Sequence, residues 1–315
     1  MISRRNFLKG MGALVLGGVA FSGYAFGVEP LLRLRVQPYH LQPAGWPDGL
    51  TLRIAVLADI HACDPWMTAE RIRRIAEQTN ALSPDIILLL GDYSAGHRWV
   101  TRKVASSDWS QALAELSAPM GVHAILGNHD WWDDLTAQER GHGPVYGHKA
   151  LQNVGINVYE NDVVRLEKDG IPFWLAGLGD QLAFPPNRGR GLRHWQGVDD
   201  LPGTLEKITD DAPIILMAHE PDIFPNVPER VCLTLSGHTH GGQIRLFGYS
   251  PVVPSRYKNR YAYGHIVETA SATTEAEKPH QNSRPRHLIV SGGLGCSMLP
   301  VRFGVPPEIV QIDIG

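Results

Sequence analysis

The stretch DIILLLGDY, residues 85–93, has five consecutive apolar residues followed by a glycine and an aspartate. An apolar run without polar alternation is typical of a strand that is buried on both faces, as in a parallel sheet. The run LRIAVLADIH at 52–61 has the same character. Between the two lies a helical pattern that begins after Thr68, a residue suited to cap a helix. The order strand, helix, strand predicts an α/β domain.

The same alternation continues along the chain, and the second half has more strands than helices. Further helices are predicted at about 107–116 and 145–155, and further strands at 121–130, 156–162, 172–180, 212–222, 230–242, 287–295 and 308–314. A strand-rich second half predicts a second sheet packed against the first. We expect one domain over 51–315, with long connections at about 94–107, 181–204 and 248–286 around its site.

The N-terminus differs in character from this domain. SRRNFLKG at residues 3–10 precedes a Gly-rich apolar run at 11–27. Two adjacent arginines before such a run are typical of a twin-arginine export signal. The alternative is an amphipathic or core helix with a chance arginine pair. We expect 1–27 to be a signal or an N-terminal anchor, and 28–50 to be a linker.

An export signal of this kind has consequences for location. The twin-arginine translocase would be a partner during export, and the protein would work in the periplasm or on the outer face of the cytoplasmic membrane. The apolar run is short and interrupted, which disfavours a permanent span. Gly23-Tyr24-Ala25 would serve as a cleavage site, and the sequence leaves both cleavage and retention open.

Charge and cysteine usage narrow the classes of ligand. The formal net charge is -3, which argues against a nucleic acid as structural partner. Removal of residues 1–27 would leave 26 basic against 32 acidic residues. A phosphate-type ligand would then depend on locally concentrated positive charge, such as metal ions. The three scattered cysteines contain no C-x-x-C pair, so neither a disulfide framework nor a cysteine zinc site is expected.

Five of the apolar strand candidates end in residues that commonly bind metals. An aspartate after a strand is by itself usually a turn or a cap, but five such endings together are a pattern. In α/β sheets, ligands bind at the carboxyl ends of the strands, where these residues would meet. His238 and His240, one residue apart, would point to the same side of an extended segment. The endings are Asp59-x-His61, Gly91-Asp92, Gly127-Asn128-His129-Asp130, His219 and His238-x-His240.

Carboxylate and amide oxygens together with imidazole nitrogens suit Mn, Fe or Zn. Seven such groups are too many for one ion that keeps an open position, and they fit two divalent ions sharing a carboxylate. The glycines at 91, 127, 237, 241 and 242 would let the backbone turn sharply and leave the ions reachable. The sequence therefore predicts a dinuclear metal centre.

These five blocks, in this order, resemble the signature of the calcineurin-like metallophosphoesterases, over about residues 52–245. With its twin-arginine start and its size, the chain is similar to the small exported bacterial phosphodiesterase branch. The resemblance implies an α/β fold, a four-layer α/β/β/α sandwich with two mixed sheets flanked by helices. It also implies three ligands for each ion and one that bridges them: Asp59, His61 and His240; Asn128, His219 and His238; and Asp92 as the bridge.

The chemistry of two such ions suggests hydrolysis of phosphate esters. A bridging hydroxide would attack phosphorus in line with the departing oxygen. By resemblance, His129 is not a ligand and would stabilise the transition state or protonate the leaving group, and Asp130 would orient its ring. A spectator role for His129 is the alternative. The family more commonly has glutamate where this chain has Asp130.

The sequence indicates less about the substrate than about the metal centre. Trp131 and Trp132 would form a pocket wall suited to a lipid-linked or nucleotide-linked phosphate ester, and a membrane surface nearby is a further expected partner. Arginines at 188, 190, 193, 256 and 260 could grip phosphate or belong to solvated loops. Phosphodiesters are the expected substrates. The alternatives are a phosphomonoesterase, including a protein phosphatase, and a non-catalytic metal-binding envelope protein.

Overall fold

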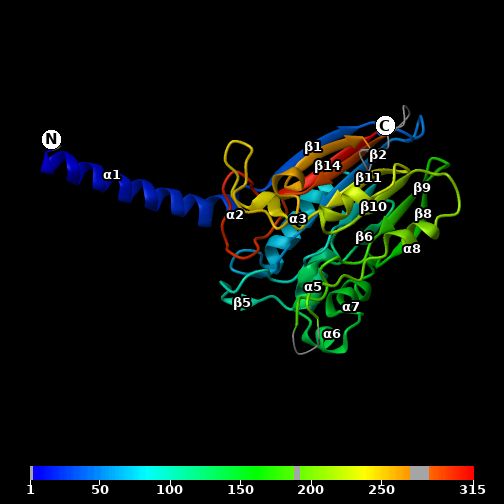
Figure 1. The fold of residues 1–315 in the computed structure, drawn as a ribbon, viewed down its shortest axis with the longest axis horizontal. Coiled ribbons are helices and arrows are strands. Elements are labelled where there is room, and N and C mark those ends of the chain that lie inside the picture. The colour runs from blue at the N-terminus through cyan, green and yellow to red at the C-terminus, as the bar shows by residue number, and fades with distance from the viewer. Residues whose placement is uncertain (1–2, 188–191, 270–283) are drawn as a thin grey trace.

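The computed structural model describes residues 3–187, 192–269 and 284–315. Two six-stranded mixed sheets are stacked at its centre (Figure 1). The first sheet has the order β1-β14-β2-β4-β6-β7, in which β14 runs antiparallel to β2 and the other pairs are parallel. Its strands are β1 (Arg35–Leu41), β14 (Glu308–Ile314), β2 (Leu52–Leu57), β4 (Ile86–Leu89), β6 (Val122–Ala124) and β7 (Asn157–Val158).

The second sheet has the order β12-β13-β11-β10-β9-β8, with four parallel strands in the middle and an antiparallel strand at each edge. Its strands are β12 (Gly264–Thr269), β13 (Pro285–Val290), β11 (Val231–Ser236), β10 (Ile214–Met217), β9 (Ile171–Gly177) and β8 (Asp162–Lys168). A separate two-stranded ribbon pairs β3 (Cys63–Asp64) with β5 (Arg102–Lys103).

The central strands are buried on both faces, as their apolar runs predict. In β4, Ile86 and Leu88 pack between the two sheets, whereas Ile87 and Leu89 face the helices outside the first sheet. The side chains alternate because successive residues of a strand point to opposite faces. The two inner strands β2 and β4 therefore need no polar face: β4 has no polar residue, and β2 has only the exposed Arg53 near its start.

Helices cover the outer faces of both sheets, which completes the expected α/β/β/α sandwich. The helices α3 (Ala69–Ala81), α4 (Ser106–Leu113) and α7 (Tyr146–Asn153) pack on the first sheet. As expected, the Thr68 hydroxyl caps α3, accepting the N–H of Arg71. The second sheet is covered by α8 (Leu201–Glu206) and the 3₁₀ turn η3 (Pro221–Asn226). The shorter elements are α5 (Asn128–Trp132), α6 (Leu135–Arg140), η4 (His240–Gly242) and η5 (Lys258–Tyr261).

The segment 28–50 is not the linker that its sequence suggested. Residues 35–41 form β1, which pairs in register with β14 at the edge of the first sheet. The side chain of Arg35 also forms an ion pair of 2.8 Å with the buried Glu308. A strand at the edge of a sheet has only one covered face, so its residues alternate between polar and apolar. For this reason β1 was not recognised from its sequence.

The N-terminal residues form a helix that projects from the body (Figure 1). Helix α1 (Arg4–Gly23) buries none of its residues, and it continues through η1 (Tyr24–Val28) into α2 (Glu29–Leu32). An 18-residue window within Arg4–Leu32 has a mean hydropathy of 1.6, so by length and composition this stretch is able to cross a membrane. The glycines do not interrupt the helix, so the run is longer than its sequence suggested.

Candidate metal centre

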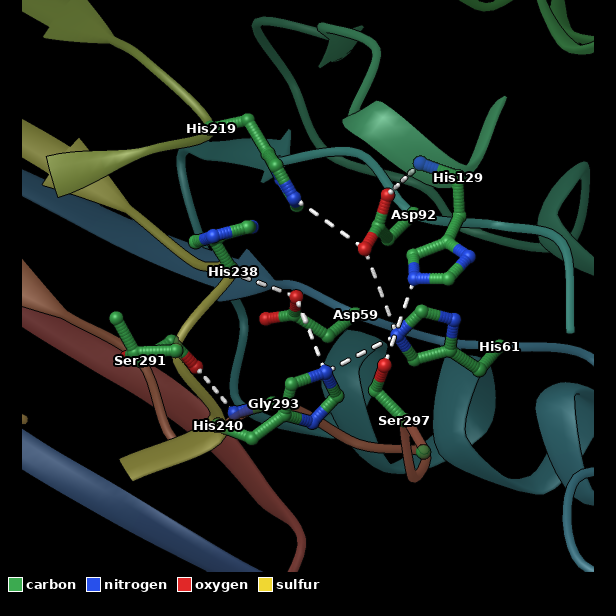
Figure 2. Close-up of polar contacts among 12 residues, drawn as sticks. Asp59, His61, Asp92, His129, His219, His238, His240, Ser291, Gly293 and Ser297 are labelled. Carbon is green, nitrogen blue, oxygen red and sulfur yellow. Dashed lines mark hydrogen bonds and ion pairs between the residues drawn. The ribbon is translucent and has the colours of Figure 1, made fainter. Parts of the chain in front are cut away.

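The predicted ligands lie on loops at the carboxyl ends of parallel strands from both sheets. Those after β2, β4 and β6 come from the first sheet, and those after β10 and β11 come from the second. The structure brings all seven predicted ligands together there, and Figure 2 shows most of them. Five of the seven have backbone φ angles between 47° and 67°, which are uncommon outside glycine: Asp59, His61, Asp92, His238 and His240.

His238 and His240 reach the site differently from the extended segment that the sequence suggested. Strand β11 ends at Ser236, and the chain then turns, with His240 in η4. As a result, His240 groups with Asp59 and His61, whereas His238 groups with His219 and Glu220. Both histidines have left-handed backbones in this tight turn, and their rings therefore point to different halves of the site.

The first half of the site is built on Asp59. The Nε2 atoms of His61 and His240 are 3.0 Å apart, and Oδ1 of Asp59 is 3.5 Å from Nε2 of His240. Oδ1 also accepts the backbone N–H of His238 at 2.8 Å, whereas Oδ2 lies against Gly237 and Gly293. The carboxylate of Asp59 and the two close imidazole nitrogens form one compact group of donor atoms, which fits a cation.

The second half is built on Asn128. Its Oδ1 lies 2.8 Å from Nδ1 of His238 and 3.2 Å from Nε2 of His219. Oδ2 of Asp92 lies between the two halves, 3.5 Å from Nε2 of His61 and 3.3 Å from Nε2 of His219. Asp92 is thus the residue positioned to touch cations on both sides.

Two of the imidazoles are oriented by backbone carbonyl groups. Nδ1 of His61 donates to the carbonyl of Ser94 at 2.8 Å, and Nδ1 of His219 donates to that of Leu90 at 2.6 Å. Because a carbonyl can only accept, Nδ1 of each ring carries a proton, and each ring in its neutral form presents the lone pair of Nε2 to the site. This is the arrangement that metal-binding histidines usually have.

The electrostatics of the site keep the imidazoles of His61 and His240 neutral and the carboxylate of Asp92 ionised. Burial would lower the pKa of His219, but the nearby carboxylates, Asp92 above all, raise it well above its usual value, so an ion bound there displaces a proton. Burial lowers the pKa of His61 to about 3 and that of His240 well below its usual value. Although burial alone would raise it, the surrounding histidines, His219 above all, hold the pKa of Asp92 well below its usual range. Neutral imidazoles and an ionised carboxylate are the forms that bind divalent metals. The donor set therefore fits such ions.

Glycines let the ligand loops approach one another closely. A Cβ on Gly237 would lie 2.6 Å from Oδ2 of Asp59. A Cβ on Gly127 would overlap the carboxylate of Asp92 and lie 2.7 Å from Cε1 of His219. Any side chain at these two positions would displace a predicted ligand.

His129 lies beside the cluster and faces open space. It is only partly buried, and its ring packs edge-on against His61, with centroids 5.0 Å apart. Its backbone N–H donates to Oδ1 of Asp92 at 2.8 Å. Its Nε2 is 3.4 Å from the hydroxyl of Ser297 (Figure 2). The ring can therefore reach a substrate bound at the cluster.

Asp130 does not orient the ring of His129, contrary to the expectation from sequence. Its carboxylate accepts three backbone N–H groups, those of Asp92, Tyr93 and Gly127, each at 2.9 Å. These bonds fasten the loop after β4 to the loop after β6. With three backbone donors from two loops, the carboxylate holds together the loops that carry Asp92 and Asn128.

A pocket of about 330 Å³ opens onto the cluster. Asp92, Asn128, His129, His238 and His240 form its inner wall, and Trp132 lies on its side, as predicted. The outer wall is made of Ile244, Val252, Pro254, Met298, Leu299 and Val301. Trp131 is not part of the wall, because it is fully buried against Phe184 in the core.

The predicted recognition arginines that the structure describes form ion pairs elsewhere or line no part of the pocket. Arg256 pairs with Asp222 at 3.3 Å, and Arg260 pairs with Glu268 at 2.7 Å. Arg193 is not among the residues that line the pocket. Arg188 and Arg190 lie outside the described residues.

Sequence reasoning missed the loop 291–303, which closes the site. Gln243 holds this loop by donating to the carbonyls of Leu299 and Val301 and accepting the N–H of Ser297. The fully buried Arg302 donates to backbone carbonyls and lies 3.3 Å from Nδ1 of His240. The glycines of SGGLG at 291–295 were the one signal that the backbone approaches other groups there.

Comparison with known proteins agrees with this site. The model of the calcineurin-like phosphoesterases matches residues 52–242, which include all five strand-end blocks. The uncharacterized metallophosphoesterase YkuE of Bacillus subtilis is 31% identical, over 99% of this chain and 98% of its own length. The phosphodiesterase YaeI of Escherichia coli is 28% identical, over the full length of both. A transmembrane protein with metallophosphoesterase domain from Danio rerio is 30% identical over 63% of this chain and 42% of its own.

Proposed function

Because this chain belongs to the calcineurin-like phosphoesterase family, we propose that it is a metal-dependent hydrolase with a dinuclear centre that cleaves phosphodiesters. The observation that carries the proposal is the convergence of seven buried ligand groups, six of them around Asp92. They form two sets of three with one shared carboxylate, which is a donor set for two divalent ions, Mn, Fe or Zn.

The roles proposed for the ligands follow these two sets. Asp59, His61 and His240 would hold one ion, with Asp92 shared. Asn128, His219 and His238 would hold the other. Divalent ions bound there would neutralise charge on the phosphoryl oxygens and lower the pKa of a bound water.

His129 would act on the substrate directly. Its ring lies on the pocket wall next to the cluster and is free of any ligand role. There it can donate a hydrogen bond to a phosphoryl oxygen or a proton to the departing alkoxide. Ser297 would hold the ring in this place through its hydroxyl, and Asp130 would hold the loops beneath it.

Two points support phosphodiesters over monoesters. The full-length relative from Escherichia coli is named a phosphodiesterase. The pocket extends beyond the cluster on an apolar wall, which leaves room for a second ester group. No described cation on that wall would pair with the extra charge of a monoester.

The test compares two chromogenic esters after controlled metal loading. The protein is stripped with a chelator and reloaded with Mn, Zn or Fe, and hydrolysis of bis-p-nitrophenyl phosphate and p-nitrophenyl phosphate is measured. We expect activity to return with about two metal equivalents and to favour the diester. A preference for the monoester would indicate a phosphatase, and no activity with any ion would refute an enzymatic role.

The N-terminal helix would place this activity at a membrane. Export by the twin-arginine route is suggested by Arg4 and Arg5 directly before α1. The length and composition of Arg4–Leu32 would also allow retention as an anchor. In either case the domain would work on the outer side of the cytoplasmic membrane.

A further inference from the structure

We infer that the substrate carries a long apolar chain, which lies in the pocket beside the cluster, and that it is drawn from the bilayer in which α1 is anchored. This inference rests on the proposed function and names its substrate class. Three observations carry it: the apolar chemistry of the pocket wall, the exposed apolar side chains near the pocket, and the contacts between their loops and α1.

The outer wall of the pocket offers almost nothing to a polar substrate. Among the described residues that line the whole pocket, the only ionisable groups belong to the cluster or to His129 on the inner wall. The amide of Gln243 is occupied by three backbone groups, and the hydroxyl of Thr239 donates to the carbonyl of Ala262. A sugar, a nucleobase or a peptide would leave its polar groups unpaired against this wall, whereas an alkyl chain would not.

The mouth of the pocket exposes large apolar side chains to solvent. Val252 is 63% exposed and Met298 is 69% exposed, although both line the pocket. Phe247 does not line the pocket, but it is fully exposed at the tip of the turn Leu246–Tyr249, which follows the lining residue Ile244 in the chain. Phe247 and Met298 also have left-handed backbones, with φ of 50° and 60°, which strains a side chain of their size. Such a group of exposed apolar residues is typical of an interaction surface.

The turn that carries Phe247 and the loop that carries Met298 both connect to the end of α1 through Phe303. The ring of Phe303 packs on Phe21 of α1, with centroids 4.8 Å apart, and the N–H of Arg302 donates to the carbonyl of Ala25 at 2.9 Å. Phe303 also accepts the N–H of Arg245, next to the Leu246–Tyr249 turn. In Figure 1 the turn 246–249 and the loop 291–303 lie on the side of the body from which α1 leaves.

A bilayer explains this arrangement better than another protein. Helix α1 has 20 residues without a buried one, and a helix of that length is about 30 Å long, the thickness of a bilayer core. If α1 spans a bilayer, the contacts of Phe303 hold Phe247 and Met298 at the surface of that bilayer. The pocket then opens toward the lipid, where a chain can enter without crossing water.

The test uses two diesters with the same scissile bond and different chains, p-nitrophenyl methyl phosphate and p-nitrophenyl hexadecyl phosphate. In both, a water oxygen bonds to phosphorus as the bond to the aryl oxygen breaks, which yields the alkyl phosphate and p-nitrophenol. The full chain is reconstituted in phosphatidylcholine vesicles that contain the hexadecyl ester. We expect its kcat/KM to exceed that of the methyl ester by about tenfold or more, because each buried methylene favours binding.

Two variants of one residue type test the pocket. Val252→Glu places a carboxylate on the pocket wall, and Val267→Glu makes the same change at a 51% exposed site on β12. We expect the hexadecyl-to-methyl ratio to fall about fivefold or more in the first and to stay unchanged in the second. A ratio that Val252→Glu does not alter would overturn the assignment of the pocket.

A second pair tests the bilayer as the source. Phe247→Glu should lower the turnover of the hexadecyl ester in vesicles relative to that in dodecyl maltoside micelles by about threefold or more. Leu135→Glu, at an exposed site on α6, should leave this quotient unchanged. Equal quotients in both variants would overturn the bilayer as the source.

The outcomes separate this inference from the proposed function. If both esters are hydrolysed at equal rates, the inference fails and the phosphodiesterase stands. If neither ester is hydrolysed with any divalent ion, the proposed function fails, and the inference fails with it.

Discussion

The carboxylate of Asp130 accepts the backbone N–H of Asp92 at 2.9 Å, which links two loops that each carry a predicted ligand. The same carboxylate accepts the N–H groups of Tyr93 and Gly127. Because these loops follow neighbouring parallel strands, β4 and β6, one side chain fixes their spacing. The distance between Asp92 and Asn128 thus depends on a residue that is not itself a predicted ligand and does not line the pocket.

Replacing this carboxylate should loosen the centre. Asp130→Asn turns one acceptor oxygen into a donor that faces a backbone N–H, so we expect a loss of about 2–4 kcal/mol in the free energy of unfolding. Bound metal should also decrease. Urea denaturation and elemental analysis measure the two effects.

Asp134→Asn is a matched control, since Asp134 also accepts two backbone N–H groups but lies away from the ligand loops. It should reduce stability without loss of metal. If Asp130→Asn keeps its metal and its stability but loses turnover, Asp130 acts through His129 after all.

His129 and Ser297 should act as one unit. We expect His129→Ala to lower kcat by about 10²–10⁴ with metal content unchanged, because the ring contacts substrate and not the ions. Ser297→Ala should lower kcat by about tenfold through the misplaced ring. The double variant should be no slower than His129→Ala, because a positioning residue has nothing left to position. Additive losses would mean that Ser297 has a role of its own.

Removal of one predicted ligand should empty one half of the site. His240→Ala deletes a nitrogen from the group that contains Asp59 and His61, so elemental analysis should find about one ion per chain in place of two. The exposed His142 gives the control, and His142→Ala should keep both ions. Loss of both ions in His240→Ala would show that the halves bind cooperatively.

Metal affinity should weaken in acid. Burial above all, together with the nearby Asp92, raises the pKa of Asp59 to about 7 in the metal-free protein. Below that pH a proton occupies the carboxylate that the ion needs, so binding must release the proton. We expect the affinity to fall by up to about tenfold for each pH unit below about 7. Titration calorimetry at pH 5.5, 6.5 and 7.5, in two buffers of different ionisation enthalpy, would show the released proton. Affinity independent of pH in this range would contradict it.

The N-terminal segment should divide into a dispensable and a structural part. Removing residues 1–23 deletes no buried side chain, so the melting temperature should stay within about 2 °C. Removing 1–33 also deletes the buried residues Ala25, Glu29 and Pro30 and the contact of Pro30 with Arg71. That variant should melt about 5 °C lower or more. Equal melting of the two would mean that the docked segment contributes nothing.

The ligands could be predicted from the sequence because each of them follows an apolar run that is typical of a buried strand. The run at 86–90 could only be an inner strand, and parallel inner strands present their carboxyl ends at one edge. The glycines beside the ligands were also readable, since a Cβ on Gly127 or Gly237 would displace a ligand.

The tertiary structure alone decided the partners of Asp130, the place of β1 and the loop 291–303 that closes the site. Each depends on pairing between segments far apart in the chain, as when β1 adds to β14 across some 270 residues. A local pattern records how a residue meets its own neighbours in the chain. It does not record which backbone amides come within 3 Å of a carboxylate after folding, because that choice is made by the packing of all the other elements at once.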